Sequence, residues 1–147
     1  MDFLTLLTAT SPQWIHLSTL VLRVFIGICF FIHGLGKLGL VGSGNMAGFE
    51  SWLKSLGFPF PRFQARLAML TEVFGGACLA AGFLMRLSCC FLIITMIVAA
   101  LLGHKGGGYL ITNNPPGNEY TINLTAALIA ILLLGPGPFS LDWILFS

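Results

Sequence analysis

Residues 17–38 read LSTLVLRVFIGICFFIHGLGKL. This stretch is mostly apolar, has no proline, and is long enough for a membrane-spanning helix, which needs roughly 20 such residues. Three further apolar runs follow, at about 66–84, 87–103 and 120–134. None alternates polar and apolar residues as β-barrel strands do. The sequence therefore predicts an all-α integral membrane protein, an antiparallel four-helix bundle forming a single transmembrane domain over residues 1–147.

The composition of the chain points the same way. Of its 147 residues, 56% are hydrophobic and 8% are charged, whereas a soluble domain carries about 25% charged residues. A chain so apolar is not disordered. Its 7 basic and 5 acidic residues leave a net charge of only +2, so nucleic-acid binding, which depends on clustered Lys and Arg, has no support. The lipid bilayer is the expected surroundings of this chain.

The start of the chain and its basic residues predict the topology. MDFLTLLTATSPQ has an acidic residue and no basic region, so we expect it to be retained rather than cleaved as a signal peptide. Four crossings place both termini on one side, with an aromatic belt at each interface: Trp14 and Trp143 on the side of the termini, and Trp52, Tyr109 and Tyr120 on the side of the loops. Because Lys and Arg concentrate in cytoplasmic loops, the two long loops are expected in the cytoplasm. The basic residues that flank these loops are Lys37, Lys54, Arg62, Arg66 and Lys105.

The two long loops differ in character. In the first, at roughly 39–64, Met46, Phe49 and Leu53 recur at helical spacing, which predicts a short amphipathic helix in the membrane interface. This helix is either a simple cover or a lid over a site. The second loop, at roughly 104–119, is glycine-rich and lacks the spacing of a phosphate-binding loop, so we interpret it as a flexible linker.

Four cysteines lie within the apolar runs, and none has the C-x₂₋₄-C spacing of a metal site. No metal is therefore expected. We interpret the cysteines as small buried hydrophobic residues, and a redox pair of Cys29 with Cys78 stays an alternative. The other two are Cys89 and Cys90.

Ionisable residues inside the apolar runs are the candidate site, because each costs about 2.5–3.5 kcal/mol at the membrane centre. His33 and Lys37 are four residues apart and share a helix face. When the second run folds back antiparallel, Glu72 comes level with them. The third and fourth runs bring His104 and Glu119 to the same side. We expect these five residues to cluster as ligand-binding or proton-relay groups, while a second polar group lies in the opposite half: Arg23, Arg86 and Asp142.

Two interpretations of the first cluster remain open. A Lys–Glu pair can simply join two helices, whereas two histidines, two carboxylates and a lysine together are suited to proton transfer coupled to redox chemistry or binding. One lysine cannot satisfy all the other polar groups, so water or a polar ligand head is needed. We therefore expect a cavity that touches at least three of four residues: His33, Glu72, His104 and Glu119.

Three segments carry a resemblance to a known family. LVLRVFIGICFFIHGLGKL (20–38) has an Arg, a Gly and then His-Gly-x-x-Lys-Leu; EVFGGACLAAGFLMR (72–86) has a Glu, a glycine pair and a closing Arg; and 118–145 has a Glu before the apolar run and Ser-Leu-Asp after it. Together they resemble the DoxX-like family over roughly residues 17–144. The matching positions are Arg23, His33, Gly34, Lys37, Glu72, Gly75, Gly76, Arg86, Glu119 and Asp142.

The resemblance implies a small four-helix protein of the bacterial inner membrane. One branch of the family is the small membrane subunit of thiosulfate:quinone oxidoreductase, but no thiosulfate-handling motif is present here. The sequence also lacks a haem, flavin or iron–sulfur signature, so we expect an accessory redox subunit rather than a complete enzyme, with no covalent cofactor. Its expected ligand is a quinone or a similar amphipathic molecule, and its partner a soluble oxidoreductase or a second copy. The alternative is a non-catalytic membrane module that binds lipid or helps other proteins to assemble.

Overall fold

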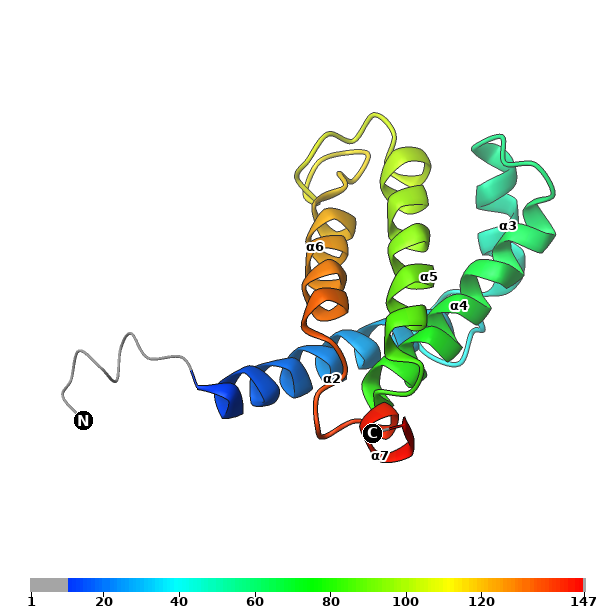
Figure 1. The fold of residues 1–147 in the computed structure, drawn as a ribbon. Helices are drawn as coiled ribbons and strands as arrows, with labels where there is room; N and C mark the ends of the chain where they lie inside the picture. Colours follow the sequence, from blue (N-terminus) through cyan, green and yellow to red (C-terminus); the bar gives the residue numbers. More distant parts are fainter. Residues whose placement is uncertain (1–10, 147) are drawn as a thin grey trace.

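The computed structural model describes residues 11–146, and within them it contains six α-helices, one π-helical segment and no strand (Figure 1). Helices α2 (Pro12–Lys37) and α4 (Pro61–Ala81) form the first pair. Between them lies α3 (Met46–Ser55), which confirms the predicted amphipathic helix of the first loop. Asn45 begins α3, and its side chain accepts a hydrogen bond of 2.8 Å from the Gly48 amide.

The second pair consists of α5 (Met85–Val98), which continues into the π-helical segment η1 (Ala99–Gly103), and α6 (Glu119–Leu134). A short last helix, α7 (Leu141–Phe146), follows and was not predicted. The predicted apolar runs thus correspond to four helices of the structure, although α4 starts earlier than predicted because Pro61 fits the first turn of a helix.

Helices α2 and α4 pack with their backbones in contact, because glycines face each other. A methyl group built on Gly27 would lie 2.5 Å from the Ala80 nitrogen and 2.6 Å from the Gly76 oxygen. One built on Gly76 would lie 2.6 Å from the Phe31 nitrogen. The contacts run from Gly27 with Ala80 to Gly34 with Val73, so the two helices are antiparallel. The small-residue rows in the sequence explain this close packing.

The two pairs do not run side by side. In Figure 1, α5 and α6 stand upright, α2 runs across beneath them, and α4 leans away from α5. Helices whose directions differ in one view cannot be parallel in space. The structure is therefore two antiparallel pairs that cross, and the predicted bundle of four aligned helices is not confirmed.

Two helices of the described chain are long and apolar enough to cross a membrane: Pro12–Lys37, and α5 with η1 over Met85–Gly103. Helix α6 is apolar but has only 16 residues. Helix α4 has 21 residues but carries Arg62, Arg66 and Glu72, which lower its mean hydropathy. Length and hydropathy therefore support two of the four predicted spans, and the prediction of four is not confirmed.

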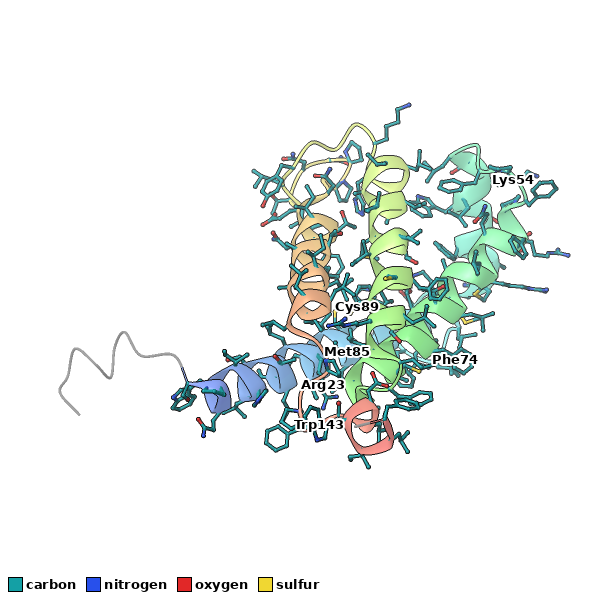
Figure 2. The ribbon with its side chains drawn as sticks, in the orientation of Figure 1. Arg23, Lys54, Phe74, Met85, Cys89 and Trp143 are labelled. Atoms are coloured by element: carbon teal, nitrogen blue, oxygen red, sulfur yellow. The ribbon has the colours of Figure 1, made fainter. Side chains whose placement is uncertain are left out.

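The packed core lies among the four long helices and contains fully enclosed Met85 and Cys89 (Figure 2). Leu92 of α5 contacts Gly75 of α4, and a Cβ atom on that glycine would lie 3.3 Å from the leucine Cγ. Outside the core, large apolar side chains are widely exposed, and Phe74 is an example with 63% of its surface accessible. Such a surface fits lipid better than water.

Candidate functional site

A cavity of about 610 Å³ opens where α4 and α5 diverge beyond their contact at Gly75 and Leu92. The end of α2 forms one side, and α3 covers it. Of the five residues predicted to cluster, four line this cavity: His33, Lys37, Glu72 and His104. Its remaining wall is largely apolar, and the residues facing it include Phe30, Leu53, Leu67, Phe91, Ile94 and Met96. Polar groups on one side and an apolar wall on the other suit an amphipathic molecule.

The predicted contact between Lys37 and Glu72 is present as an ion pair between Nζ and Oε2. The Glu72 side chain is 5% exposed and the Lys37 side chain 20%. The ammonium group also lies over the ring of Phe49, 5.0 Å from its centre, a cation–π contact. The pair joins α2 to α4 and places a charge on the cavity wall, so it has both a structural and a site-forming effect.

His33 is bonded to a residue that the sequence interpretation placed only in the aromatic belt. The Tyr120 hydroxyl lies 2.8 Å from His33 Nε2, and the thiol of Cys29 lies 2.9 Å from the same hydroxyl. Tyr120 also lines the cavity. Because Tyr120 begins the fourth apolar run at the depth of His33, the register argument that paired Lys37 with Glu72 would have included it.

His104 and Glu119 make contacts with the long second loop. His104 Nδ1 lies 3.0 Å from the Pro116 carbonyl oxygen, and the ring still borders the cavity. Glu119 is not among the residues that line the cavity; its carboxylate accepts a hydrogen bond of 3.1 Å from the Ile111 amide. Glu119 therefore stabilises the 104–119 loop, and three of the four residues expected at the cavity are there.

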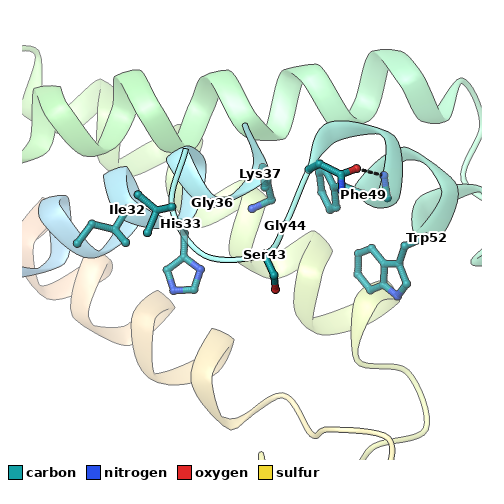
Figure 3. Close-up of a pocket in the computed structure, with 11 residues that line it drawn as sticks. Ile32, His33, Gly36, Lys37, Ser43, Gly44, Phe49 and Trp52 are labelled. Carbon is teal, nitrogen blue, oxygen red and sulfur yellow. Dashed lines mark hydrogen bonds between the residues drawn. The ribbon is translucent and has the colours of Figure 1, made fainter. Parts of the chain in front are cut away.

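A second hollow of about 600 Å³ adjoins the first and shares His33, Lys37, Phe49 and Trp52 with it. Figure 3 shows His33 and Trp52 at its two sides, with Lys37 and Phe49 between them. Its other lining residues are Val41, Ser43, Gly44 and Asn45 of the glycine-rich turn before α3, Ile32 and Gly36 of α2, and Gly48 of α3. The end of α2, this turn and α3 thus form a mouth, here termed the polar mouth, whose lining is more polar than that of the cavity beside it.

Helix α3 covers the cavity through two stacked rings. Phe49 and Trp52 lie 5.8 Å apart with an angle of 22° between their planes. The Trp52 ring reaches η1, where a Cβ atom on Gly103 would lie 3.0 Å from it. Glycine at this position is what permits the indole to close the space between α3 and η1.

The second predicted polar group lies at the opposite end of the α2–α4 pair. Arg23 is 2% exposed, and its guanidinium donates to the carbonyl oxygens of Ala80, at 2.5 Å, and Phe139. Asp142 accepts hydrogen bonds from the amides of Leu84, at 2.7 Å, and Met85, at 2.9 Å. These contacts cap the start of α5 and fasten the segment before α7 to α2 and α4.

Arg86 belongs to the same end of the molecule, because its guanidinium lies next to Gly135 at the end of α6. Nearby, Gly137 faces His16 of the first turns of α2. The first turns of α2 and the segment between α6 and α7 therefore lie together, away from the cavity.

No group of three or more His, Cys, Asp and Glu side chains within residues 11–146 could hold a metal ion. The four cysteines are free thiols. Cys89 is buried as expected, whereas Cys90 is exposed, and Cys29 faces Tyr120. Cys29 and Cys78 are half-buried, so the interpretation of all four as buried hydrophobic residues holds only for Cys89 and is wrong for Cys90.

Comparison with known proteins identifies the family of this chain. The family model described as DoxX matches residues 18–105. The chain belongs to the DoxX family. It is similar to the inner membrane protein YqjF of Escherichia coli, with 29% identity over 87% of this chain and 92% of that protein. No solved structure matches the chain significantly.

Two further relatives are named for a location or for an activity. The inner membrane protein YphA of Escherichia coli is 26% identical over 84% of this chain and 86% of its own. A protein named as putative oxidoreductase CatD, from Bacillus subtilis, is 33% identical over 58% of this chain and 59% of its own. This chain is thus a DoxX family membrane protein. Two of its relatives are named as inner membrane proteins, and another is named as a putative oxidoreductase.

Proposed function

We propose that this DoxX protein is the membrane subunit of a redox system and binds a quinone, or a similar amphipathic molecule, in the cavity beneath α3. The observation that carries the proposal is the cavity itself, about 610 Å³ with Lys37, Glu72, His33 and His104 on its wall. A quinone head has carbonyl oxygens that accept hydrogen bonds and a ring and tail that prefer an apolar wall. The relative named as an oxidoreductase supports a redox role.

In this proposal each polar residue on the cavity wall has its own role. His33 donates a hydrogen bond to a quinone carbonyl, and Lys37 stabilises the negative charge that develops on reduction. His104 was a second candidate donor, but its Nδ1–H donates to the Pro116 carbonyl, so the neutral ring offers Nε2 as an acceptor. Glu72 exchanges a proton with the reduced ligand, because it is the carboxylate on the cavity wall. Glu119 drops out of this role since its carboxylate is bound to the second loop. The electrons come from a soluble oxidoreductase partner.

The proposal includes the placement of the chain. It resides in the bacterial inner membrane and crosses it several times, with the two ends on one side and the long loops in the cytoplasm. The nearness of His16 and Gly137 supports the common side of the ends. Cytoplasmic long loops would present α3 and the polar mouth to a soluble partner, and a second copy of the chain is the alternative partner.

Titration of the purified protein with decylubiquinone, followed by thermal unfolding in detergent, tests the binding. A ligand that binds only the folded state raises its stability by about 2.7 kcal/mol at one hundred times Kd. We expect a saturable shift in the native chain that is lost in the double variant Lys37→Met with Glu72→Gln. His16→Gln is the matched control, because this histidine lies outside both hollows, and it should keep the full shift.

Tryptophan fluorescence locates the bound quinone. A variant that keeps only Trp52, with Trp14 and Trp143 changed to Phe, should be quenched along a saturating curve, because Trp52 lines the cavity. A variant that keeps only Trp14 should show the straight line of partition into detergent. Equal quenching without saturation in the two single-tryptophan variants would contradict the quinone proposal and favour a non-catalytic membrane module.

A further inference from the structure

We infer that Cys29 and Tyr120 hold His33 in the tautomer with its proton on Nδ1, so that the cavity offers a hydrogen-bond donor and prefers the oxidised, carbonyl form of its ligand. The preference for one redox form rests on the proposed function. The tautomer itself does not, and it can be measured on the protein without any ligand.

The three side chains form a continuous chain of hydrogen bonds between two helices. Cys29 and His33 lie four residues apart on one face of α2, and Tyr120 reaches both from the first turn of α6. The phenol oxygen lies 2.9 Å from the Cys29 sulfur and 2.8 Å from His33 Nε2. The tyrosine and imidazole rings are tilted by 43° with their centres 5.4 Å apart, so the ring of His33 is held in place as well as bonded.

The direction of these bonds follows from the chemistry of the three groups. The phenol has one proton, and it can donate that proton either to an imidazole nitrogen or to a thiol sulfur. A thiol is a weak acceptor, whereas the unprotonated imidazole nitrogen is a good one. Tyr120 therefore donates to His33 Nε2, and its oxygen is left to accept the proton of the Cys29 thiol. The protons of the phenol and of the thiol then each have an acceptor.

This direction decides what His33 presents to the cavity. If Nε2 accepts from Tyr120, the neutral imidazole carries its proton on Nδ1. Within residues 11–146, no side chain or carbonyl group accepts from Nδ1, and His33 lines both hollows. The second ring nitrogen is thus a donor available to a bound molecule.

A donor at this point distinguishes a quinone from a quinol. A quinone carbonyl accepts the hydrogen bond and adds no proton of its own. A quinol hydroxyl can also accept, but its own proton must then reach a second acceptor at the same time, such as the Glu72 oxygen that Lys37 leaves free. One hydrogen bond of typical net strength corresponds to about three- to tenfold in affinity. We expect the oxidised form to bind about that much more tightly.

Long-range ¹H–¹⁵N correlation of protein labelled at histidine, in detergent micelles, tests the tautomer. His33→Gln assigns its signals among those of the three histidines of the chain. We expect the Nδ1–H form in the native protein and a mixture of both tautomers in Tyr120→Phe. Tyr109→Phe is the matched control, since the other tyrosine lies outside both hollows. A proton on Nε2, or on both nitrogens, in the native protein would overturn the inference.

Substitution of Cys29 tests the thiol at the other end of this series of hydrogen bonds. Cys29→Ser keeps a donor and should keep the Nδ1–H form, whereas Cys29→Ala removes the donor and should raise the share of the other tautomer. Cys90→Ala, on the exposed face of α5, should change nothing. Identical spectra for the serine and alanine variants at position 29 would remove Cys29 from the inference.

The preference for the oxidised form is tested by comparing the Kd values of decylubiquinone and decylubiquinol. Tyr120→Phe should bring the ratio of the two Kd values close to one, while Tyr109→Phe leaves it unchanged. The two proposals fail separately. If neither ligand binds, the proposed function is contradicted, but the NMR spectrum still decides the tautomer of His33. If quinone binds but the ratio of the two Kd values is the same in the native protein and in Tyr120→Phe, the inference is contradicted.

Discussion

Glu72 keeps only 4% of its surface exposed, and its charge is balanced by the ammonium group of Lys37. A carboxylate in such surroundings needs its partner, because an unpaired charge loses its solvation without compensation. The pair of Arg62 and Glu50 differs in this respect. It spans 3.4 Å with side-chain exposures of 73% and 33%, so water can replace either partner. The two pairs allow burial to be separated from ion pairing.

We expect Glu72→Gln to lower the free energy of unfolding by about 3 kcal/mol, the lower end of the range for breaking a buried pair, since Lys37 retains some exposure. Adding Lys37→Met should recover part of that loss, because no unpaired charge remains. Unfolding in detergent at rising denaturant measures both. Strictly additive losses in the double variant would contradict the contact.

Glu50→Gln serves as the control for that experiment. We expect a loss of about 0–1 kcal/mol, as is usual for an exposed pair. A loss equal to that of Glu72→Gln would show that α3 depends on its ion pair with α4 more than the structure indicates.

At the scale of the helices, the packing of α4 depends on two neighbouring glycines, one of which faces α2 and the other α5. Gly76 faces the backbone of α2, and a Cβ atom there would lie 2.6 Å from the Phe31 nitrogen. Gly75 faces the side chain of Leu92, with the closest approach at 3.3 Å. Backbone atoms cannot move aside without separating the helices, whereas a leucine side chain can rotate slightly.

We therefore expect Gly76→Ala to destabilise the protein by about 1–3 kcal/mol, the usual effect of overpacking. Gly75→Ala should be close to neutral, because the strain at Leu92 is offset by alanine's higher helix propensity, worth about 1 kcal/mol. Thermal unfolding followed by circular dichroism compares the two. Equal effects at both positions would show that the backbone contact of Gly76 with α2 is not what limits the packing.

At the scale of the whole molecule, one junction holds four helices together away from the cavity. Arg23 of α2 binds carbonyl oxygens at the end of α4 and before α7, and Asp142 of α7 caps α5. A methyl group on Gly82 would lie 2.5 Å from the Ser140 Cβ atom, so the turn between α4 and α5 also touches this segment. The crossing of the two helix pairs is set here.

Asp142→Ala should lower stability by about 0.5–2 kcal/mol, because the start of α5 loses its cap. The stability of Asp142→Asn should lie between those of the native protein and Asp142→Ala. Asparagine offers one oxygen, whereas the two amides now bind separate oxygens of the aspartate. Hydrogen exchange at the Leu84 and Met85 amides should rise in both variants. Glu119→Gln, whose carboxylate binds the distant Ile111 amide, should leave exchange at these two amides as it is in the native protein.

Sequence patterns predicted the features that depend on helix geometry along one hairpin. The regular rise per residue of a helix was sufficient to predict the contact between Lys37 and Glu72. The spacing of Met46, Phe49 and Leu53 was sufficient to predict helix α3. The crossing of the pairs was beyond this reasoning, because it depends on Asp142 meeting the turn at Leu84, a contact between distant segments. The bond of Glu119 to Ile111 escaped for a similar reason: irregular loops have no repeat from which to place a backbone amide.

The junction around Arg23 also has a consequence for the order of events during synthesis. Ribosomes add about 5–20 residues per second, so Arg23 exists for on the order of ten seconds before Phe139 and Asp142 are made. Throughout that interval the guanidinium lacks its Phe139 acceptor, and the first amides of α5 lack their cap. The crossing of the two helix pairs can therefore become final only after α6 has left the ribosome, which makes it one of the last steps of folding.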